Sequence, residues 1–209
     1  MKVLVACEES QAVCNEFRKL GHVAYSCDIV PCSGGHPEWH LQQDVIPLLK
    51  ETWDMIIAFP PCTYLTITGN RWFNIDRYGE KAIRRHRDRK DAVNFLWLLR
   101  MLIVIKLPLK ILSELCQANG ENQIRSSIHG SLATLLKKRT CLWLKGLPKL
   151  KPTNIVEIPP RKMFDSGKTM PSWYVEAGKL PKEERSKLRS KTFPGIAKAM
   201  AEQWGCLHD

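Results

Sequence analysis

One short stretch of the sequence places a cysteine directly after two prolines, Pro60 and Pro61, where an apolar run ends. Proline restricts its own backbone φ, so the pair holds the side chain of Cys62 in a defined direction. A cysteine thiolate is a strong, soft nucleophile near neutral pH, and it suits attack on C6 of a cytosine that has been turned out of a duplex. A buried structural cysteine in a turn after a strand fits the same residues. Cys62 is therefore a candidate nucleophile.

Two aspartates follow apolar runs that are predicted to be strands. Asp28 comes directly after residues 23–27, and Asp44 lies at the end of a weaker run near residues 40–45. An acid at the end of the second strand can accept hydrogen bonds from both ribose hydroxyls of a nucleoside cofactor, and Asp44 is placed to hold an adenine amino group. A helix cap or a turn explains either aspartate as well.

The turn after the first predicted strand lacks the glycines that usually cradle a pyrophosphate. Where Gly-x-Gly would be expected, the chain reads Ala6-Cys7-Glu8-Glu9-Ser10. Two acids repel a pyrophosphate, whereas S-adenosyl-L-methionine (SAM) carries a sulfonium cation and an ammonium group, which acids suit. The predicted cofactor is SAM, and its predicted contacts are Ala6, Cys7, Glu8, Glu9, Asp28, Asp44, Phe59 and Pro60.

Apolar runs alternating with helical segments position these residues. The predicted strands are residues 2–7, 23–27, 40–45, 55–59 and 142–144, and the predicted helices are residues 10–19, capped by Ser10, 80–102 and 195–204. Such alternation is typical of α/β proteins with a doubly wound, mostly parallel sheet. We therefore expect a Rossmann-like fold in which ligands bind at the carboxyl ends of the strands.

The composition of the chain changes near residue 147. Residues 1–146 have the pattern of one catalytic domain, and 209 residues suffice for one α/β core with a small appendage. Residues 147–192 are rich in Pro, Lys and Ser and show little periodicity. Residues 147–209 are therefore predicted to be an irregular, basic extension that ends in the helix 195–204, packed back on the core.

The net charge of +11 is unevenly distributed. Residues 1–134 hold 16 Lys and Arg against 14 Asp and Glu, whereas residues 135–209 hold 16 against 7. A basic tail on a nearly neutral body indicates a polyanion such as DNA as partner, although a solvated basic surface gives the same count. The residues predicted to contact nucleic acid are Arg71, Arg84, Arg85, Lys137 and Arg139.

The eight cysteines are scattered, and several lie in apolar runs. Cys27, Cys32, His36 and His40 follow one another at spacings that match no common zinc module, so no metal site is predicted. The first residues have the pattern of a strand and not of a signal peptide, and no apolar run reaches the roughly 18 residues of a membrane span. These features predict a protein of a reducing bacterial or phage-infected cytoplasm, without a membrane partner.

Taken in order, four motifs resemble a known family. Residues 2–9, 26–28, 43–45 and 60–62 look like motifs I to IV of the cytosine-C5 DNA methyltransferases. Residues 34–44, 54–72, 140–148 and 190–205 resemble the short DNA methylases of phages and prophages still more closely. The resemblance implies a SAM-methyltransferase sheet, with Cys62 as nucleophile, Asp28 on the ribose, Asp44 on the adenine, and residues 191–199 as the helix that completes the cofactor pocket.

The chain departs from this family in two ways. It leaves no room for a separate target-recognition domain, and it lacks the Glu-Asn-Pro motif whose acid serves N3 of cytosine. Glu121-Asn122-Gln123 is no substitute, because no strand precedes it. Two alternatives therefore stay open: a DNA amino-methyltransferase, although Phe59 and Cys62 replace its polar and aromatic motif members, and a non-catalytic, decayed DNA-binding prophage protein.

Residues 107–138 are the one segment that the resemblance does not cover. No strand or helix pattern is evident in residues 107–116, where the fifth strand and its acid belong. With suitable synonymous codons, reading one base earlier turns these residues into IAIENPIGVM, which puts the acid at Lys110. Lysine codons, which can form slip-prone A-runs, flank the segment. We therefore predict that residues 107–138 are frame-shifted relative to the family. The chain as written is then either inactive or a sequencing artefact of an active enzyme.

Overall fold

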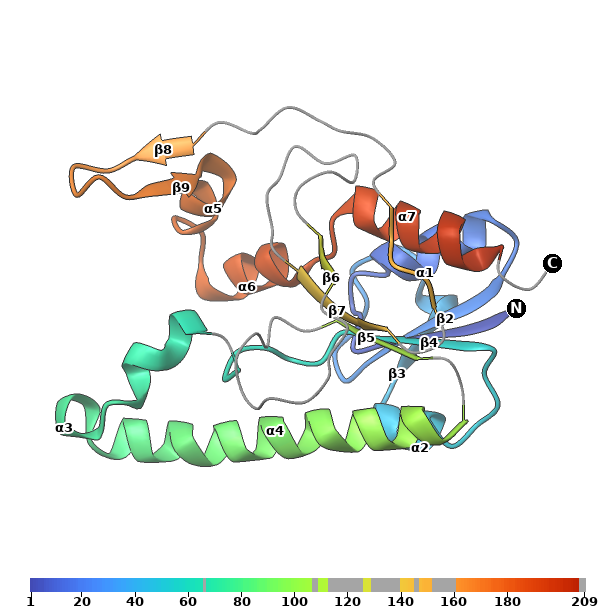
Figure 1. Cartoon of the computed structure of the whole chain (residues 1–209), viewed down its shortest axis with the longest axis horizontal. Helices are drawn as coiled ribbons and strands as arrows, with labels where there is room; N and C mark the ends of the chain where they lie inside the picture. Colours follow the sequence, from blue (N-terminus) through green and yellow to red (C-terminus); the bar gives the residue numbers. More distant parts are fainter. Residues whose placement is uncertain are drawn as a thin grey trace.

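The computed structural model describes residues 1–65, 67–106, 109–112, 126–128, 140–144, 147–151 and 161–206; for residues 67, 68, 103–106, 109–112, 126–128 and 140–143 it describes the backbone alone. Its main sheet has seven strands in the order β3-β2-β1-β4-β5-β7-β6 (Figure 1). The strands are β1 (Lys2–Ala6), β2 (Val23–Asp28), β3 (His40–Gln42), β4 (Met55–Ala58), β5 (Leu109–Leu112), β6 (Ser126–Ile128) and β7 (Thr140–Leu144). β1 to β5 pair in parallel, and β7 is antiparallel to β5 and β6.

Helices cover both faces of the sheet. They are α1 (Ala12–Lys19), α2 (Val45–Leu48), α3 (Ile75–Tyr78), α4 (Glu80–Lys106), α5 (Ser172–Ala177), α6 (Lys182–Ser190) and α7 (Pro194–Gly205), with the 3-10 helices η1 (Pro37–Trp39) and η2 (Ile67–Phe73). Figure 1 shows α1 and α7 above the sheet and α2 and α4 below it. The prediction of a mixed α/β fold with a mostly parallel sheet is confirmed.

The alternation of side chains along β1 divides the core into two halves. Val3 and Val5 pack with buried residues of α1 and α7, whereas Leu4 and Ala6 pack with buried residues of α2 and with Leu99 of α4. Both halves are apolar, so the strand is buried on both faces, as its continuous apolar run predicts.

Several predicted boundaries need correction, among them that of the last predicted strand, which begins at Thr140 and not at residue 142. The third strand ends at Gln42, because Asp44 starts α2 instead of closing a strand. The N-cap of α1 is Gln11 and not Ser10. The long helix extends beyond residue 102 to Lys106. The predicted C-terminal helix is confirmed as α7, and it packs against the core through Ile196, Met200 and Trp204.

The prediction that residues 147–192 are irregular is wrong for residues 161–190. A second sheet forms there from β8 (Arg161–Met163) and β9 (Thr169–Pro171), followed by α5 and α6. Strands of three residues are too short to show a periodicity of two. The signal for α6 was its charge pattern, since it has acids in its first turn, bases in its last turn and a proline before it.

Residues 107–116, in which no strand pattern is evident from the sequence, nevertheless contain a strand. Leu109–Leu112 form β5, whose Leu109 and Ile111 pair with Ile56 and Ala58 of β4. Alignment with a buried neighbouring strand supplies backbone hydrogen bonds that the local sequence pattern does not reveal. The other residues of 107–116 lie outside the described part of the chain.

No helix among the described residues is long and apolar enough to cross a membrane. In the same part of the chain six cysteines are not in disulfides, at positions 7, 14, 27, 32, 62 and 206.

Candidate functional site at the carboxyl edge of the sheet

The central strands end level with one another. Ala6 pairs with Cys27 of β2 and with Ala58 of β4, and two further backbone bonds extend this pairing, from Glu8 N to the Cys27 carbonyl (3.0 Å) and from Phe59 N to the Ala6 carbonyl (2.9 Å). Residues 6–9, Asp28, Phe59 and Pro60 therefore share the carboxyl edge of the sheet, where α/β proteins bind ligands.

Cys7 is at the centre of this edge, in a left-handed backbone conformation with φ 57°. Burial, together with the smaller effects of the nearby charges of Asp28, Cys27 and Asp44, raises the pKa of its thiol to about 12. The thiol is therefore protonated at neutral pH and is not a nucleophile. Asp44 comes to the same edge because the preceding residue, Gln43, donates its backbone N–H to the Asp28 carbonyl (3.1 Å).

Glu8 does not face the edge. Its side chain is buried, and its carboxylate accepts hydrogen bonds from the backbone N–H groups of Val13 (2.7 Å) and Cys14 (3.2 Å) at the start of α1. Burial raises the pKa of Glu8 to about 8, an effect that these two hydrogen bonds oppose. Glu8 thus stabilises the N-terminus of α1 in place of Ser10, which corrects its prediction as a cofactor contact.

Glu9 ties the loop after β2 to the edge. Ser33 donates from its backbone N to the Glu9 carbonyl (2.8 Å) and from its hydroxyl to the Glu9 carboxylate (2.5 Å). The next residue, Gly34, packs so tightly that a Cβ would lie 2.6 Å from the carbonyl oxygen of Ser10. One carboxylate oxygen of Glu9 is therefore committed to holding this loop.

Asp28 and Asp44 both have the local structural role that the sequence left open. Asp28 is half-buried and accepts a hydrogen bond from Val30 N (3.3 Å), and Asp44 is exposed and caps α2 by accepting from Ile46 N (2.9 Å). A carboxylate has acceptor sites for several hydrogen bonds, so these contacts leave both residues able to bind a ligand.

Cys62 is exposed, which argues against a buried structural cysteine. It follows the buried Pro60 and starts a tight turn, in which Leu65 N donates to the Cys62 carbonyl (2.9 Å). The first half of α4 holds this turn. Arg85 donates a hydrogen bond to the Thr63 carbonyl (3.1 Å), and its guanidinium lies 5.0 Å from the centre of the Tyr64 ring. A hydrogen bond to Asp88, also on α4, raises the pKa of Tyr64.

Cations and aromatic rings alternate on the surface beside Cys62. We call this the η2–α4 cluster, defined as Arg71, Trp72, Phe73, Tyr78, Arg85 and Arg89. Arg71 lies 4.6 Å from the Trp72 ring centre, and Arg85 and Arg89 lie 5.0 and 4.6 Å from that of Phe73. Aromatic rings interleaved with cations can stack bases and attract phosphates.

The residues predicted to contact nucleic acid divide into three groups. Arg71 and Arg84 are exposed, whereas Arg85 is half-buried and holds the Cys62 turn. Lys137 and Arg139 lie outside the described residues. The aromatic members of the η2–α4 cluster were not predicted; their spacing around Arg71 was the available signal.

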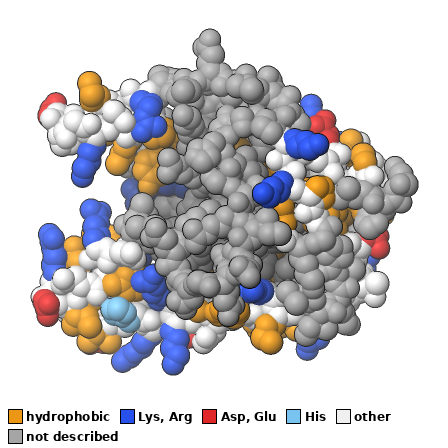
Figure 2. Space-filling model, in the orientation of Figure 1, with side chains coloured by type: hydrophobic (Ala, Val, Ile, Leu, Met, Phe, Trp, Pro, Cys, Tyr) orange, Lys and Arg blue, Asp and Glu red, His pale blue; other side chains and the backbone are white. Residues whose placement is uncertain are grey.

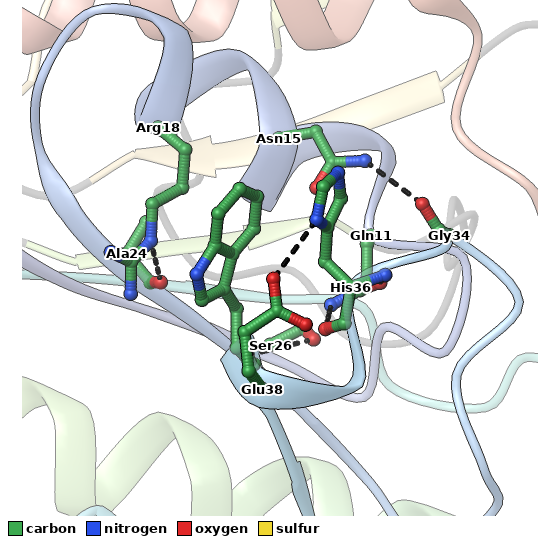
Figure 3. Close-up of polar contacts among 9 residues, drawn as sticks. Gln11, Asn15, Arg18, Ala24, Ser26, Gly34, His36 and Glu38 are labelled. Carbon is green, nitrogen blue, oxygen red and sulfur yellow. Dashed lines mark hydrogen bonds and ion pairs between the residues drawn. The ribbon is translucent and has the colours of Figure 1, made fainter.

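A cavity of about 690 Å³ runs along α1, from Ser10 to His22. Its wall includes Trp39, whose indole ring is stacked on His36 (centroids 3.9 Å apart) and lies 4.8 Å from the guanidinium of Arg18. Gln11 holds the loop by donating to the His36 carbonyl (2.7 Å) and accepting from His36 N (3.0 Å) (Figure 3). None of the predicted cofactor contacts lines this cavity.

Three of the four residues considered for zinc have other partners. Cys27 Sγ donates to the Gln43 carbonyl (3.4 Å), the His40 ring bonds to Ser26 Oγ (2.8 Å) and to the Val30 carbonyl (2.9 Å), and His36 pairs with Glu38 (3.0 Å). Within the described ranges no three His, Cys, Asp or Glu side chains are grouped as metal ligands.

No protein-family model matches the chain, and no curated protein matches it.

Proposed function

We propose that this chain has the scaffold of a SAM-dependent DNA cytosine-C5 methyltransferase of phage or prophage type, and that it binds SAM and duplex DNA. One observation carries the proposal: Cys62 is exposed in a tight turn directly after β4, at the same edge of the sheet as Asp28 and Cys7. Transfer of a group from a cofactor to a substrate requires that the nucleophile and the cofactor lie close together. A shared sheet edge brings the two sites together in this way.

The strand order supports the finer fold assignment. Order 3-2-1-4-5 for the parallel strands is that of doubly wound nucleotide-binding folds, with the switch point between β1 and β4. The reversed strand β7 beside β5 departs from the all-parallel dinucleotide-binding order and agrees with the SAM-methyltransferase sheet that the resemblance implies.

The residues at the edge fit SAM. Asp28 follows Cys27, which pairs with Ala6, and the backbone N of Gln43, next to Asp44, donates to the Asp28 carbonyl (3.1 Å). This position at the edge suits Asp28 for the ribose and Asp44 for the adenine amino group. Glu8 contributes to α1 instead, so the site relies on these two aspartates. When bound, SAM supplies a methyl group on a positively charged sulfur, from which a carbon nucleophile can take it.

The residues of the chain account for the first half of the reaction. The Cys62 thiolate adds to C6 of an extruded cytosine, which breaks the aromaticity of the ring and makes C5 enamine-like. Negative charge then develops toward N3, and an acid is needed there to neutralise it. Arg85 keeps the backbone next to Cys62 in place during this step.

The acid is the missing part. The family resemblance puts it at position 110, where this chain has lysine, and Lys110 pairs with Ile57 in the β4–β5 ladder. A lysine there cannot serve as the acidic partner at N3 of cytosine in the way that the family's glutamate does. We therefore propose that the chain as written binds both ligands but does not complete methyl transfer.

The decisive experiment mixes the protein with DNA and SAM labelled on its methyl group. The expected result is binding of both ligands without label in DNA, and label in 5-methylcytosine when a Glu-Asn-Pro segment replaces residues 110–112. Label in N6-methyladenine would identify an amino-methyltransferase instead. DNA binding without SAM binding would identify a decayed DNA-binding protein, and binding of neither ligand would refute the proposal.

A further inference from the structure

The β8–β9 pair is a short two-stranded ribbon that stands away from the main sheet (Figure 1). Its turn is closed by hydrogen bonds from Phe164 N to the Lys168 carbonyl (2.9 Å) and from Gly167 N to the Phe164 carbonyl (2.8 Å), with Gly167 in the left-handed region at φ 73°. Across the strands, the guanidinium of Arg161 donates to the hydroxyl and the carbonyl of Thr169 at 2.9 to 3.2 Å. The ribbon therefore has a defined geometry.

All residues from 161 to 170 are exposed. The apolar members are Met163, Phe164 and Met170, which are 73%, 36% and 39% exposed, and the charged members are Arg161, Lys162, Lys168 and Asp165. Apolar side chains on a ribbon that covers no core contribute little to stability, and grouped with cations they mark a binding surface.

The ribbon is attached firmly to the core. α5 packs on both of its strands, and Trp173 of α5 makes an edge contact with Phe193, the N-cap of α7, with ring centroids 5.5 Å apart. Arg189 of α6 lies 3.9 Å from the Tyr174 ring centre and donates to the Tyr174 carbonyl (3.3 Å). An isolated hairpin of this length would be marginally stable, so these contacts fix its position.

The ribbon and the η2–α4 cluster project on the same side of the molecule (Figure 1). Figure 2 shows an opening between these two projections, with Lys and Arg side chains on both. The charges on the two walls are complementary to a polyanion that lies between them.

We propose that the β8–β9 ribbon enters the major groove of duplex DNA and reads the target sequence there, the role that a separate target-recognition domain has in the family that the chain resembles. The proposal rests on the proposed function, because it assumes that DNA is the substrate. The major groove, roughly 12 Å wide, admits a two-stranded ribbon, and apolar side chains there contact thymine methyl groups. Lys162 and Lys168 contact phosphates, while Arg161 remains bonded to Thr169 and keeps the strands together.

The first test is the salt dependence of binding to a random-sequence duplex, measured by fluorescence anisotropy. The double variant Lys162→Ala/Lys168→Ala should make the negative slope of log K against log salt shallower by about 2, because each lost phosphate contact reduces its magnitude by about 1. The control Lys19→Ala/Lys198→Ala removes two exposed lysines of α1 and α7 and should keep the wild-type slope. An unchanged slope in the ribbon variant would overturn the proposal.

The second test locates the groove. Dimethyl sulfate methylates guanine N7 in the major groove, so the wild-type protein should protect N7, and the variant Met163→Ser/Phe164→Ser should lose that protection. Protection that persists in this variant would also overturn the proposal. Calorimetry with SAM distinguishes failure of the ribbon proposal from failure of the proposed function. If the ribbon variants keep the salt slope and the N7 protection but the protein binds SAM and duplex DNA, the ribbon proposal fails and the proposed function stands. A wild-type protein that binds only single-stranded RNA would overturn both.

Discussion

The guanidinium of Arg85 donates a 3.1 Å hydrogen bond to the carbonyl oxygen of Thr63, the residue next to Cys62. Through this contact a helix that begins 18 residues after Cys62 determines the backbone of the turn that carries the candidate nucleophile. Arg85 also lies between the rings of Tyr64 and Phe73, 5.0 Å from each centre. Arg85 is therefore a positioning residue for the turn.

Replacing Arg85 by alanine should lower the free energy of unfolding by about 1–3 kcal/mol, because one charged hydrogen bond and two cation–π contacts are lost. Arg84→Ala is the matched control, since Arg84 is exposed on the same helix and should cost less than about 0.5 kcal/mol. Urea unfolding measures both. Equal midpoints for the two variants would show that Arg85 does not hold the turn.

The proposed cofactor site predicts that Asp28→Ala weakens SAM binding by about 1–3 kcal/mol, the usual loss for a charged hydrogen-bond partner. Asp54→Ala is a suitable control, because Asp54 accepts a hydrogen bond from Lys2 N at the opposite end of β1 and should leave the affinity unchanged. Titration calorimetry gives both affinities. An unchanged dissociation constant for Asp28→Ala would rule this site out.

Glu8 predicts a dependence of stability on pH. Burial raises its pKa from 4.5 to about 8 in the folded protein. Between these values the folded state binds more protons than the unfolded state, so the free energy of unfolding falls as the pH rises, by at most about 1.4 kcal/mol per pH unit. The contribution of the protonated Glu8 side chain to the free energy of unfolding is complete below pH 4.5 and is lost as the pH passes about 8.

This dependence can be isolated with Glu8→Gln, which lacks the titration and should give a flatter profile of urea midpoints across the same range. Glu51→Gln removes an exposed charge and serves as the control. If Glu8→Gln and wild type fall in parallel, the pKa of Glu8 is not raised.

The packing of α7 predicts that Trp204→Ala destabilises the protein by about 3–5 kcal/mol, because the side chain is fully buried and its indole N–H donates to the Pro148 carbonyl (3.1 Å). Trp97→Ala removes an indole that is 47% exposed and should cost about 1 kcal/mol or less. Thermal unfolding compares the two. A similar loss from both would mean that α7 is not part of the core.

The frame-shift hypothesis predicts an out-of-frame Glu-Asn-Pro between the codons for Lys106 and Arg139. Resequencing the gene tests it directly, and absence of the motif would contradict it. Where the motif is found, a protein expressed in the restored frame should methylate cytosine, and Cys62→Ser in that protein should abolish the activity again.

Much of the scaffold was determined by the sequence alone. The apolar runs of β1, β2 and β4 are buried on both faces, so each appears as a continuous stretch that ends in a polar residue or a proline. Because parallel strands end at one edge, the position of Asp28 and of residues 60–62 at that edge followed from the same pattern. α7 was evident from its proline and its amphipathic repeat.

Only the tertiary structure decided what individual polar side chains do. The sequence shows Glu8 only as an acid in the loop after β1. The folded structure shows that its carboxylate accepts hydrogen bonds from the backbone N–H groups of Val13 and Cys14 at the start of α1. The contact of Arg85 with Thr63 spans 22 residues. The strand at Leu109–Leu112 became evident only through its pairing with β4. Hydrophobic periodicity is a property of neighbouring residues, whereas these contacts depend on how separate elements pack, which no local pattern encodes.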